Sequence, residues 1–274
     1  MTGRTYPAPS TTADPTTFGA PCWASLMTGD LARAQDFYGA VLGWEFRPTE
    51  LGEEFSVAVS DGVPTAALGS LTPALRIPAD WTPYFAVTDA DEAAARIRER
   101  SGTVAVGPLE LPVGRGALAA DREGGRFGIW EGRLVEDWRT WRAHRPWWLD
   151  LRAVDAFDSA IFYGGVLDWA CGRPGCCDVG YEGDEVVLWD DGRMAARITS
   201  AATPEAGGGG GNPRWNLHFP VPDVGSAVAA AVRRGGSVVG EPGPPDGGGT
   251  VLSDPDGARF VVVRAEGGHG RRTN

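Results

Sequence analysis

The spacing of apolar residues predicts the same helix twice in this chain. In residues 31–42 the apolar side chains recur three and four positions apart, at Leu31, Ala34, Phe37, Tyr38, Val41 and Leu42. This is the spacing of one buried face of an α-helix. Asp30 stands where an N-cap accepts a backbone hydrogen bond, and Gly43 stands where a helix ends. Residues 156–167 carry a closely similar pattern.

Short apolar stretches around these helices predict β-strands. In the first half of the chain they lie at residues 23–27, 55–59, 66–69, 84–87 and 127–130. Between the last two, a second helix is predicted from an Asp89 cap through Arg100, with Gly102 ending it and a further strand beginning at Val104. The predicted order is therefore strand, helix, strands, and then strand, helix, strands again.

The second half of the chain repeats the first, block by block. The segment from Pro21 to Trp44 matches the segment from Pro146 to Trp169 at one constant offset. The helix after Asp89 matches the helix after Asp223, and the turn at 121–125 matches the turn at 254–258. Three matched blocks in the same order indicate a tandem duplication.

The repeat also divides the chain into segments. We expect a tail at 1–17, a first module at 18–133, a connecting helix at 134–145, a second module at 146–266 and a tail at 267–274. The connecting helix is predicted from Leu134, Trp138 and Trp141, which recur at helical spacing.

The composition is that of a globular protein with an acidic surface. Hydrophobic residues make up 42% of the 274 residues, and the net charge is −11 at pH 7. The negative charge disfavours a nucleic-acid partner, whose phosphates need a basic face. No apolar run approaches the ~18 residues of a membrane span, and the N-terminus lacks the features of a secretory signal. We therefore expect a cytoplasmic protein with neither a membrane nor a nucleic-acid partner.

The four cysteines are Cys22, Cys171, Cys176 and Cys177. Without an export signal, disulfides are not expected. Three of the four lie in one short segment, but no second pair of ligands stands at zinc-finger spacing and no histidine is close in sequence. We therefore interpret this segment as a loop with incidental thiols.

The repeated blocks resemble the vicinal oxygen chelate superfamily, which includes glyoxalase I, extradiol dioxygenases, fosfomycin-resistance proteins and bleomycin-binding proteins. The resemblance rests on the strand and helix with Phe37-Tyr38 and Trp44, on their second copy, and on the Asp254-Pro255-Asp256-Gly257 turn before the last strand. It implies an α+β fold of two tandem βαβββ-type modules, each a paired glyoxalase-like half-barrel, forming a shared cup around a ligand. A fold of this kind does not specify an activity.

Metal-dependent members of this superfamily place a histidine on the first strand, a histidine or another ligand on a middle strand, and a glutamate on the last strand. Counting from the matched turns puts these positions at Trp23 and Trp148, at Thr82 and Asn216, and at Gly128 and Val261. None is a histidine or a carboxylate, and an indole is only a hydrogen-bond donor. Of the three histidines, only His218 lies in a predicted strand. We therefore expect neither a metal nor another cofactor.

In place of metal ligands, we expect an aromatic pocket with a few polar groups. Strand alternation predicts its ligand-binding residues as Trp23, Ser25, Met27, Thr82, Tyr84, Trp148, Asp150, Arg152, Asn216 and His218. Such a pocket favours a metal-independent protein that binds a small aromatic or hydrophobic metabolite, such as an antibiotic or a biosynthetic intermediate. The protein would act as a monomer or a homodimer.

Two other interpretations stay open. In the first, the protein is an enzyme of the same superfamily: a metal-free lyase, isomerase or cyclase that uses His218 or Asp150 as its acid or base, or, less favoured, a metal-dependent isomerase or dioxygenase. In the second, the tryptophans fill the cup and the protein is a structural or partner-binding module.

Overall fold

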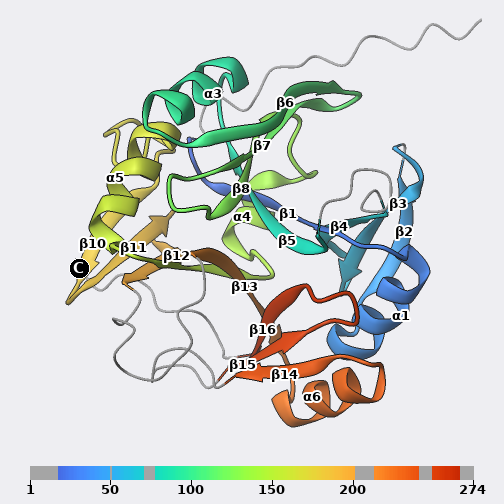
Figure 1. Ribbon diagram of the computed structural model, residues 1–274. Helices are drawn as coiled ribbons and strands as arrows, with labels where there is room; N and C mark the ends of the chain where they lie inside the picture. The colour runs from blue at the N-terminus through green and yellow to red at the C-terminus, as the bar shows by residue number, and fades with distance from the viewer. Residues whose placement is uncertain (1–17, 50, 71–77, 201–212, 241–248, 266–274) are drawn as a thin grey trace, which may run out of the picture.

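Two β-sheets with helices packed against them make up the described part of the chain. A computed structural model describes residues 18–49, 51–70, 78–200, 213–240 and 249–265 (Figure 1). Both predicted tails lie outside these residues. None of the helices within the described ranges is long and apolar enough to cross a membrane.

The first sheet has eight strands in the order β2-β3-β4-β1-β5-β8-β7-β6. Two βαβββ units form it, and they join where β1 pairs antiparallel with β5. The first unit consists of β1 (Pro21–Met27), α1 (Leu31–Leu42), β2 (Glu45–Thr49), β3 (Gly52–Ser60) and β4 (Val63–Gly69). The second consists of β5 (Asp80–Ala86), α3 (Ala90–Glu99), β6 (Thr103–Leu111), β7 (Gly114–Ala120) and β8 (Arg126–Gly132).

The second sheet repeats this topology strand for strand, in the order β10-β11-β12-β9-β13-β16-β15-β14. The short helix α4 (Trp138–Ala143) precedes it. Its first unit consists of β9 (Trp148–Ala153), α5 (Ala156–Leu167), β10 (Asp178–Glu182), β11 (Glu185–Asp190) and β12 (Arg193–Ser200). Its second unit consists of β13 (Arg214–Val221), α6 (Val224–Arg233), β14 (Ser237–Gly240), β15 (Thr250–Ser253) and β16 (Arg259–Arg264). The predicted fold class of two tandem modules is confirmed.

An aspartate cap begins each of the helices α1, α3, α5 and α6. Each of these side chains accepts a hydrogen bond from the backbone N–H three residues later, and the caps are Asp30, Asp89, Asp155 and Asp223. A cap of this kind typically stabilises a helix by about 1 kcal/mol. Because the caps recur with the helices, the local signals that begin each helix are duplicated along with the fold.

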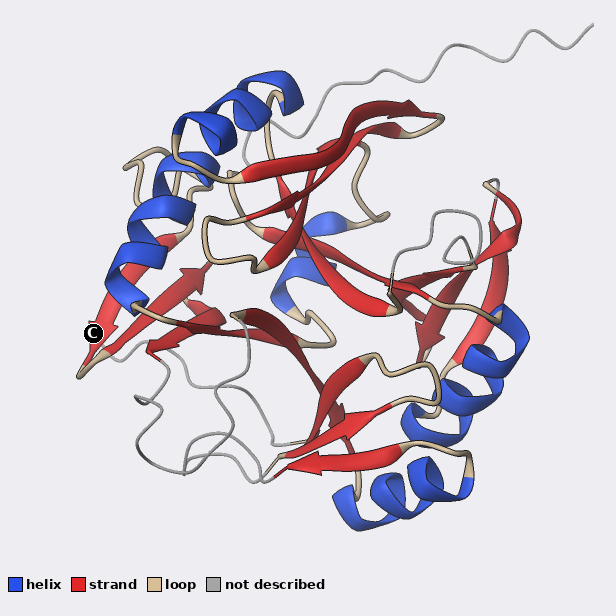
Figure 2. Cartoon of the chain, in the orientation of Figure 1, coloured by secondary structure: helices blue, strands red, loops and turns tan. Residues whose placement is uncertain are grey.

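Aromatic side chains from the helix-covered faces of both sheets form the contact between the modules. The rings of Trp81 on β5 and Phe219 on β13 lie 5.2 Å apart, and those of Phe85 and Trp215 lie 5.4 Å apart, centroid to centroid. Across the same interface α1 packs on α6, and α3 packs on α5 (Figure 2). The two modules therefore share one continuous apolar core.

Two buried tyrosine hydroxyls link the modules through this core. The hydroxyl of Tyr38 donates to Asp254 Oδ2 at 3.0 Å, which joins α1 to the turn before β16. The hydroxyl of Tyr163 donates to Asp121 Oδ2 at 2.8 Å, which joins α5 to the turn before β8. Both tyrosines are fully buried, so their predicted place in the core is confirmed.

Each sheet keeps an open face, which we define as the face turned away from its helices. The sequence analysis expected the modules to form a shared cup. What they share is the aromatic layer, because the apolar residues lie on the helix-covered faces and burial drives those faces together. The open faces belong to separate sheets, so each one offers its own place for a candidate site.

Candidate functional site

The open face of the second sheet carries polar residues that the sequence analysis selected. Alternation along β9 turns Trp148, Asp150 and Arg152 toward this face. The register of β9 and β13 places Trp148 opposite His218 and Asp150 opposite Asn216. Residues from two strands therefore meet in two adjacent cross-strand pairs.

The register also corrects the expected middle-strand position. His218, not Asn216, lies level with Trp148 on β9 and with Val261 on β16. The count along the chain failed because β13 runs antiparallel to β9. The distance of a residue from its own turn does not fix which residue of the neighbouring strand it faces. Only the hydrogen-bonded pairing fixes that.

Trp148 and His218 form a stacked ring pair. Their ring centroids are 3.6 Å apart and the planes are inclined by 19°. His218 is buried, whereas Trp148 is half-buried and keeps part of its indole accessible. An indole held in place on one side and partly accessible presents a surface on which a flat ligand can stack.

Asp150 is a carboxyl group buried next to this ring pair. It is 4% exposed, although it lies on the open face. Asn216 Nδ2 donates to its Oδ2 at 3.3 Å, and Arg152 Nε lies 3.8 Å from the same oxygen. Burial raises the pKa of Asp150, and the nearby Arg152 charge and the Asn216 hydrogen bond offset this only in part. A carboxyl with a raised pKa is suited to donating a proton or a hydrogen bond to a ligand.

The sequence analysis missed two charged residues on the neighbouring strands. Arg197 of β12 lies directly opposite Asp150, and its Nε is 3.1 Å from Glu185 Oε2 on β11. Both side chains are mostly buried, at 16% and 29% exposure. The internal repeat could have found both residues. The strands predicted at 55–59 and 66–69 have counterparts in the second module, and these counterparts contain Glu185 and Arg197.

On the open face of the first sheet, a tyrosine ring fills the space at the corresponding positions. Tyr84, not Thr82, lies level with Trp23 and Gly128. A Cβ atom on Gly128 would come within 2.2 Å of a Tyr84 ring carbon, so this ring occupies the space above the glycine. The hydroxyl of Ser25 donates to the Tyr84 hydroxyl at 3.5 Å.

The ten predicted ligand-binding residues therefore fall into two groups on separate sheets. The first group consists of Trp23, Ser25, Met27, Thr82 and Tyr84, and the second of Trp148, Asp150, Arg152, Asn216 and His218. The groups correspond position by position, because each member of the first has its repeat partner in the second. Only the tryptophan is the same in both. Charged side chains occur only in the second group, which is therefore the better candidate for a site.

The donor set of the second group does not fit the metal of the superfamily. The row that would hold the metal consists of Trp148, His218 and Val261, which together offer a single imidazole. A protein metal site needs at least three donor side chains. Within the described ranges, no three histidine, cysteine, aspartate or glutamate side chains are grouped closely enough to hold an ion. We derive no chemical step through a metal.

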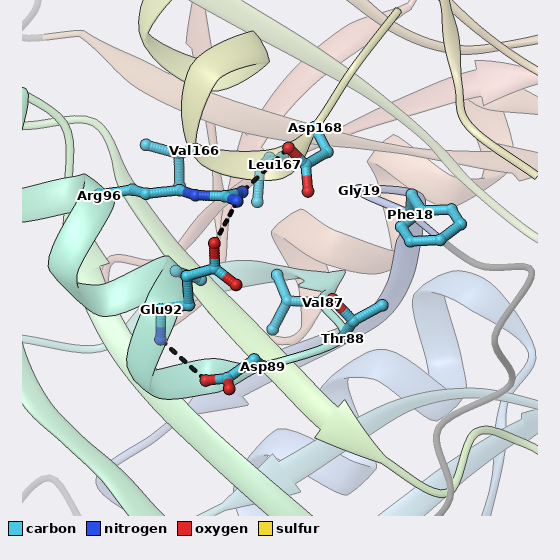
Figure 3. Close-up of a pocket in the computed structure, with 11 residues that line it drawn as sticks. Phe18, Gly19, Val87, Thr88, Asp89, Glu92, Arg96, Val166, Leu167 and Asp168 are labelled. Atoms are coloured by element: carbon cyan, nitrogen blue, oxygen red, sulfur yellow. Dashed lines mark hydrogen bonds and ion pairs between the residues drawn. The ribbon is translucent and has the colours of Figure 1, made fainter. Parts of the chain in front are cut away.

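A small hollow between α3 and α5 is occupied by ion pairs and offers no room for a ligand (Figure 3). Its free volume is about 10 Å³, which is enough for one water molecule. Arg96 Nη1 lies 2.9 Å from Asp168 Oδ1 across it. The hollow therefore belongs to the contact between the modules.

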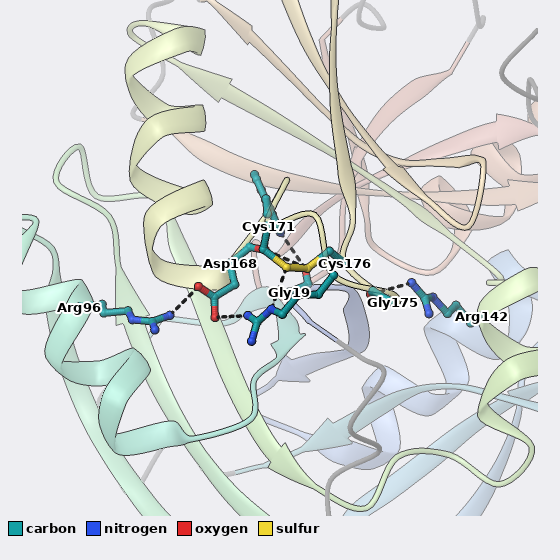
Figure 4. The surroundings of a disulfide bond; sticks show 9 residues. Gly19, Arg96, Arg142, Asp168, Cys171, Gly175 and Cys176 are labelled. Atoms are coloured by element: carbon teal, nitrogen blue, oxygen red, sulfur yellow. Dashed lines mark hydrogen bonds and ion pairs between the residues drawn. A yellow bond between two sulfur atoms is a disulfide. The ribbon is translucent and has the colours of Figure 1, made fainter. Parts of the chain in front are cut away.

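The cysteine segment differs from the expectation. Cys171 and Cys176 form a disulfide, with their Cα atoms 6.1 Å apart, so the expectation of incidental thiols was wrong for these two residues (Figure 4). The loop after α5 turns back on itself and brings the two within disulfide range, which composition and compartment arguments do not consider. Cys22 and Cys177 are buried free thiols.

Comparisons with known proteins agree with this architecture. A glyoxalase-like domain family matches residues 148–263, and a bleomycin resistance protein-like N-terminal family matches residues 22–56. The chain is 32% identical over 272 residues to the anthracycline biosynthesis protein DnrV of Streptomyces peucetius, covering 92% of this chain and 95% of that one. It is 27% identical over 267 residues to the putative glyoxylase CFP32 of Mycobacterium bovis, covering 90% and 95%.

Solved structures share the fold at low sequence identity. The Mn(II)-bound glyoxalase from Novosphingobium aromaticivorans is similar with a TM-score of 0.55 and 16% identity, covering 93% of this chain and 87% of that one. The 2,3-dioxygenase LapB from Pseudomonas sp. KL28 is similar with a TM-score of 0.57 and 14% identity, covering 94% and 95%. With its duplicated βαβββ topology and its full-length relatives, the chain belongs to the vicinal oxygen chelate superfamily as a tandem, two-module glyoxalase-like member.

Proposed function

We propose that the open face of the second sheet binds a small, flat aromatic metabolite without a metal ion. The observation that carries this proposal is the contrast between the two copies. At matched positions the second sheet has Asp150, Arg152 and Asn216 where the first sheet has uncharged Ser25, Met27 and Thr82. Of these residues Arg152 is 52% exposed and Asp150 is the buried ionisable group. Burying a carboxyl group is unfavourable even with partners, and proteins accept such instability at functional sites.

The geometry supports a binding mode with two parts. The ligand ring stacks on the accessible part of Trp148, which His218 supports from the other side. Asp150 and Arg152, on the next positions of the same strand face, orient polar substituents of the ligand. The pairing of one apolar surface with a few placed polar groups is typical of small-molecule sites.

The relatives support the ligand class. DnrV is an anthracycline biosynthesis protein, and anthracyclines are built on a flat, fused-ring quinone system. We therefore place the ligand among fused-ring metabolites of antibiotic biosynthesis, either an intermediate that is carried or an antibiotic that is sequestered. A cytoplasmic location and a lack of nucleic-acid partners remain predictions from the sequence.

Calorimetric titration with a panel of anthraquinones and naphthoquinones tests the proposal. Trp148→Ala removes the stacking surface and should weaken binding about tenfold, because an aromatic pair contributes about 0.5–1.5 kcal/mol beyond its buried area. Trp23→Ala is the matched control on the first sheet and should leave affinity unchanged. Equal losses in both variants, or no binding by any compound, would contradict the proposal.

The metal-free part of the proposal has a separate test. Binding should persist in the presence of EDTA, because the Trp148–His218–Val261 row offers one donor where a metal site needs three or more. Elemental analysis of the purified protein is the second measurement. Stoichiometric zinc, iron or manganese would overturn the metal-free part of the proposal.

A second candidate function is metal-free acid–base catalysis, which the environment of Asp150 favours. Its carboxyl is buried beside the ligand surface and its pKa is raised by that burial, as a general acid requires. Asp150→Asn should then abolish turnover of a bound quinone or hydroquinone while binding persists. His218→Ala tests the other predicted proton donor. Unchanged product formation in both variants would exclude Asp150 and His218 as the acid or base, and no turnover by the wild type would contradict this second function.

A further inference from the structure

Helix α5 exposes large apolar side chains on the side that faces away from the core. Phe157 is 47% exposed and Ile161 is 72% exposed, one helical turn apart. Val154, just before the helix, is 66% exposed, and Tyr181 of β10 is 64% exposed. The rings of Phe157 and Tyr181 stack with centroids 5.5 Å apart, so the apolar surface continues from the helix onto the sheet edge. We call these four residues the α5 patch.

The first module provides an internal control for this surface. Helix α1 occupies the matching place, and there Phe157 corresponds to Ala32 and Ile161 corresponds to Asp36. Asp36 forms an ion pair with Arg234 at the end of α6. The same fold therefore accepts a polar residue at this position, and the isoleucine is not required by packing within the chain.

The exchange of Asp36 for Ile161 leaves a hollow beside α5. Arg100, which corresponds to Arg234, forms its ion pair with its own neighbour Glu99 at 4.0 Å, while Asp158 of α5 pairs with Arg122. The hollow next to it has a volume of about 280 Å³. It is lined by Arg100, Ser101, Arg122, Asp158, Ile161 and Phe162. Where Asp36 and Arg234 form an ion pair beside α1, the matching place beside α5 is a recess with Ile161 on one side and the charged side chains of Arg100, Arg122 and Asp158 around it.

We propose that the α5 patch is the contact surface of a homodimer, with α5 packed on α5 of a second copy around a two-fold axis. The charges beside the patch fit such an arrangement. Arg122 and Asp158 lie 2.9 Å apart, with 40% and 60% of their side chains exposed. Each copy thus presents one arginine and one aspartate, and a two-fold contact that brings Arg122 of one copy to Asp158 of the other forms the reciprocal pair by symmetry. Exposed apolar surface at the centre with paired charges at the rim is typical of protein interfaces.

Pairing of the neighbouring sheet edges in the register that joins all five residues of the strand is disfavoured by charge. Strand β10 is the outermost strand of the second sheet. Antiparallel pairing of two such edges about Gly180 would bring Asp178 opposite Glu182 of the second copy, and like charges directly opposite are destabilising. The four residues of the α5 patch are uncharged, so a contact centred on α5 avoids this repulsion.

Light scattering coupled to size-exclusion chromatography tests the proposal on the full chain. The wild-type protein should elute with twice the 28.9 kDa chain mass at micromolar concentration. Ile161→Asp recreates the residue of α1 beside Arg100 and should shift the mass to that of a monomer, with association weakened at least tenfold. Because this residue occurs naturally at the matched position, the variant should fold as a monomer, with a circular dichroism spectrum like that of the wild type.

A matched control separates the patch from general surface hydrophobicity. Val232 on α6 is a helical residue that is 55% exposed, and Val232→Asp should leave the dimer mass unchanged. If Ile161→Asp fails to fold, Phe157→Ser provides an independent disruption of the same surface. A wild-type chain that is monomeric at 100 µM, or a dimer that persists in both patch variants, would overturn the proposal.

Discussion

Replacing Tyr163 with phenylalanine tests how firmly the buried hydroxyls join the two modules. The ring remains, so only the oxygen is lost from the aromatic layer. That oxygen donates to Asp121 at 2.8 Å and accepts from Trp215 Nε1 at 2.9 Å, and both partners are buried. Leaving a buried polar group without its hydrogen-bond partner lowers the free energy of unfolding by about 1–3 kcal/mol, and leaving a charged group without one lowers it more. Two such groups give an expected destabilisation of about 3–5 kcal/mol.

Thermal unfolding followed by circular dichroism measures this effect. A loss of that size lowers the melting temperature by roughly 6–20 °C, because 1 kcal/mol shifts a chain of this size by about 2–4 °C. Tyr38→Phe should behave alike, since Tyr38 donates to Asp254 and accepts from Trp81, both at 3.0 Å. Tyr181→Phe is the control, because its hydroxyl lies on an exposed side chain. Melting of both core variants within ~2 °C of the wild type would refute the reasoning.

Two further predictions concern the open faces. The pKa of Asp150 is raised above 3.8, its ordinary value, so the folded state binds this proton more tightly than the unfolded state does. Protonation of Asp150 therefore stabilises the folded state at low pH, and this stabilisation is lost as the pH rises through the raised pKa. Asp150→Asn mimics the protonated form, so its melting temperature should equal that of the wild type at low pH and exceed it at pH 7. A lower melting temperature of the variant at pH 7 would show that the folded state stabilises the carboxylate form instead. On the first sheet, Gly128→Ala places a Cβ 2.2 Å from the Tyr84 ring and should destabilise by about 1–3 kcal/mol, measured in urea. The same change made in a Tyr84→Ala background should have little effect, and an undiminished effect there would contradict the proposed clash.

Local sequence signals predicted the helices and several interior strands, but not the interior strand β7 (Gly114–Ala120). The helix at 31–42 was predicted with the bounds that the structure shows for α1, because its apolar period, its Asp30 cap and its Gly43 terminator agree. Strand β2 was missed. Its residues Glu45–Thr49 are mostly exposed and include Pro48, as suits the edge of a sheet, so they lack the alternation that marks a half-buried strand.

The sequence predicted which face of each strand carries the candidate residues, but not which residues lie opposite one another on neighbouring strands. Alternation correctly grouped Trp148 with Asp150 and Asn216 with His218, because a strand's side chains alternate by local geometry. Which residues stand level across strands depends on pairing between segments far apart in the chain, and this is why His218 replaces Asn216 beside Trp148. The disulfide between Cys171 and Cys176 was missed for a similar reason, since it depends on the path of a loop.

The duplication explains why both proposals of function fall on the same half of the molecule. Residues that build the contact between the modules are constrained in both copies, since each contributes to one shared interface: Tyr38 and Tyr163 have the same role, as do Trp81 and Trp215. The open faces lie outside that interface and Asp36 and Ile161 lie only at its edge, so the residues at these positions can differ between the copies. In the second module the open face carries a buried carboxyl group, Asp150, and α5 carries exposed apolar side chains. Both features are unfavourable for an isolated, unliganded chain. A buried carboxyl and an exposed apolar surface, both without a counterpart at the matched positions of the first module, are what a ligand on one surface and a second subunit on the other would offset.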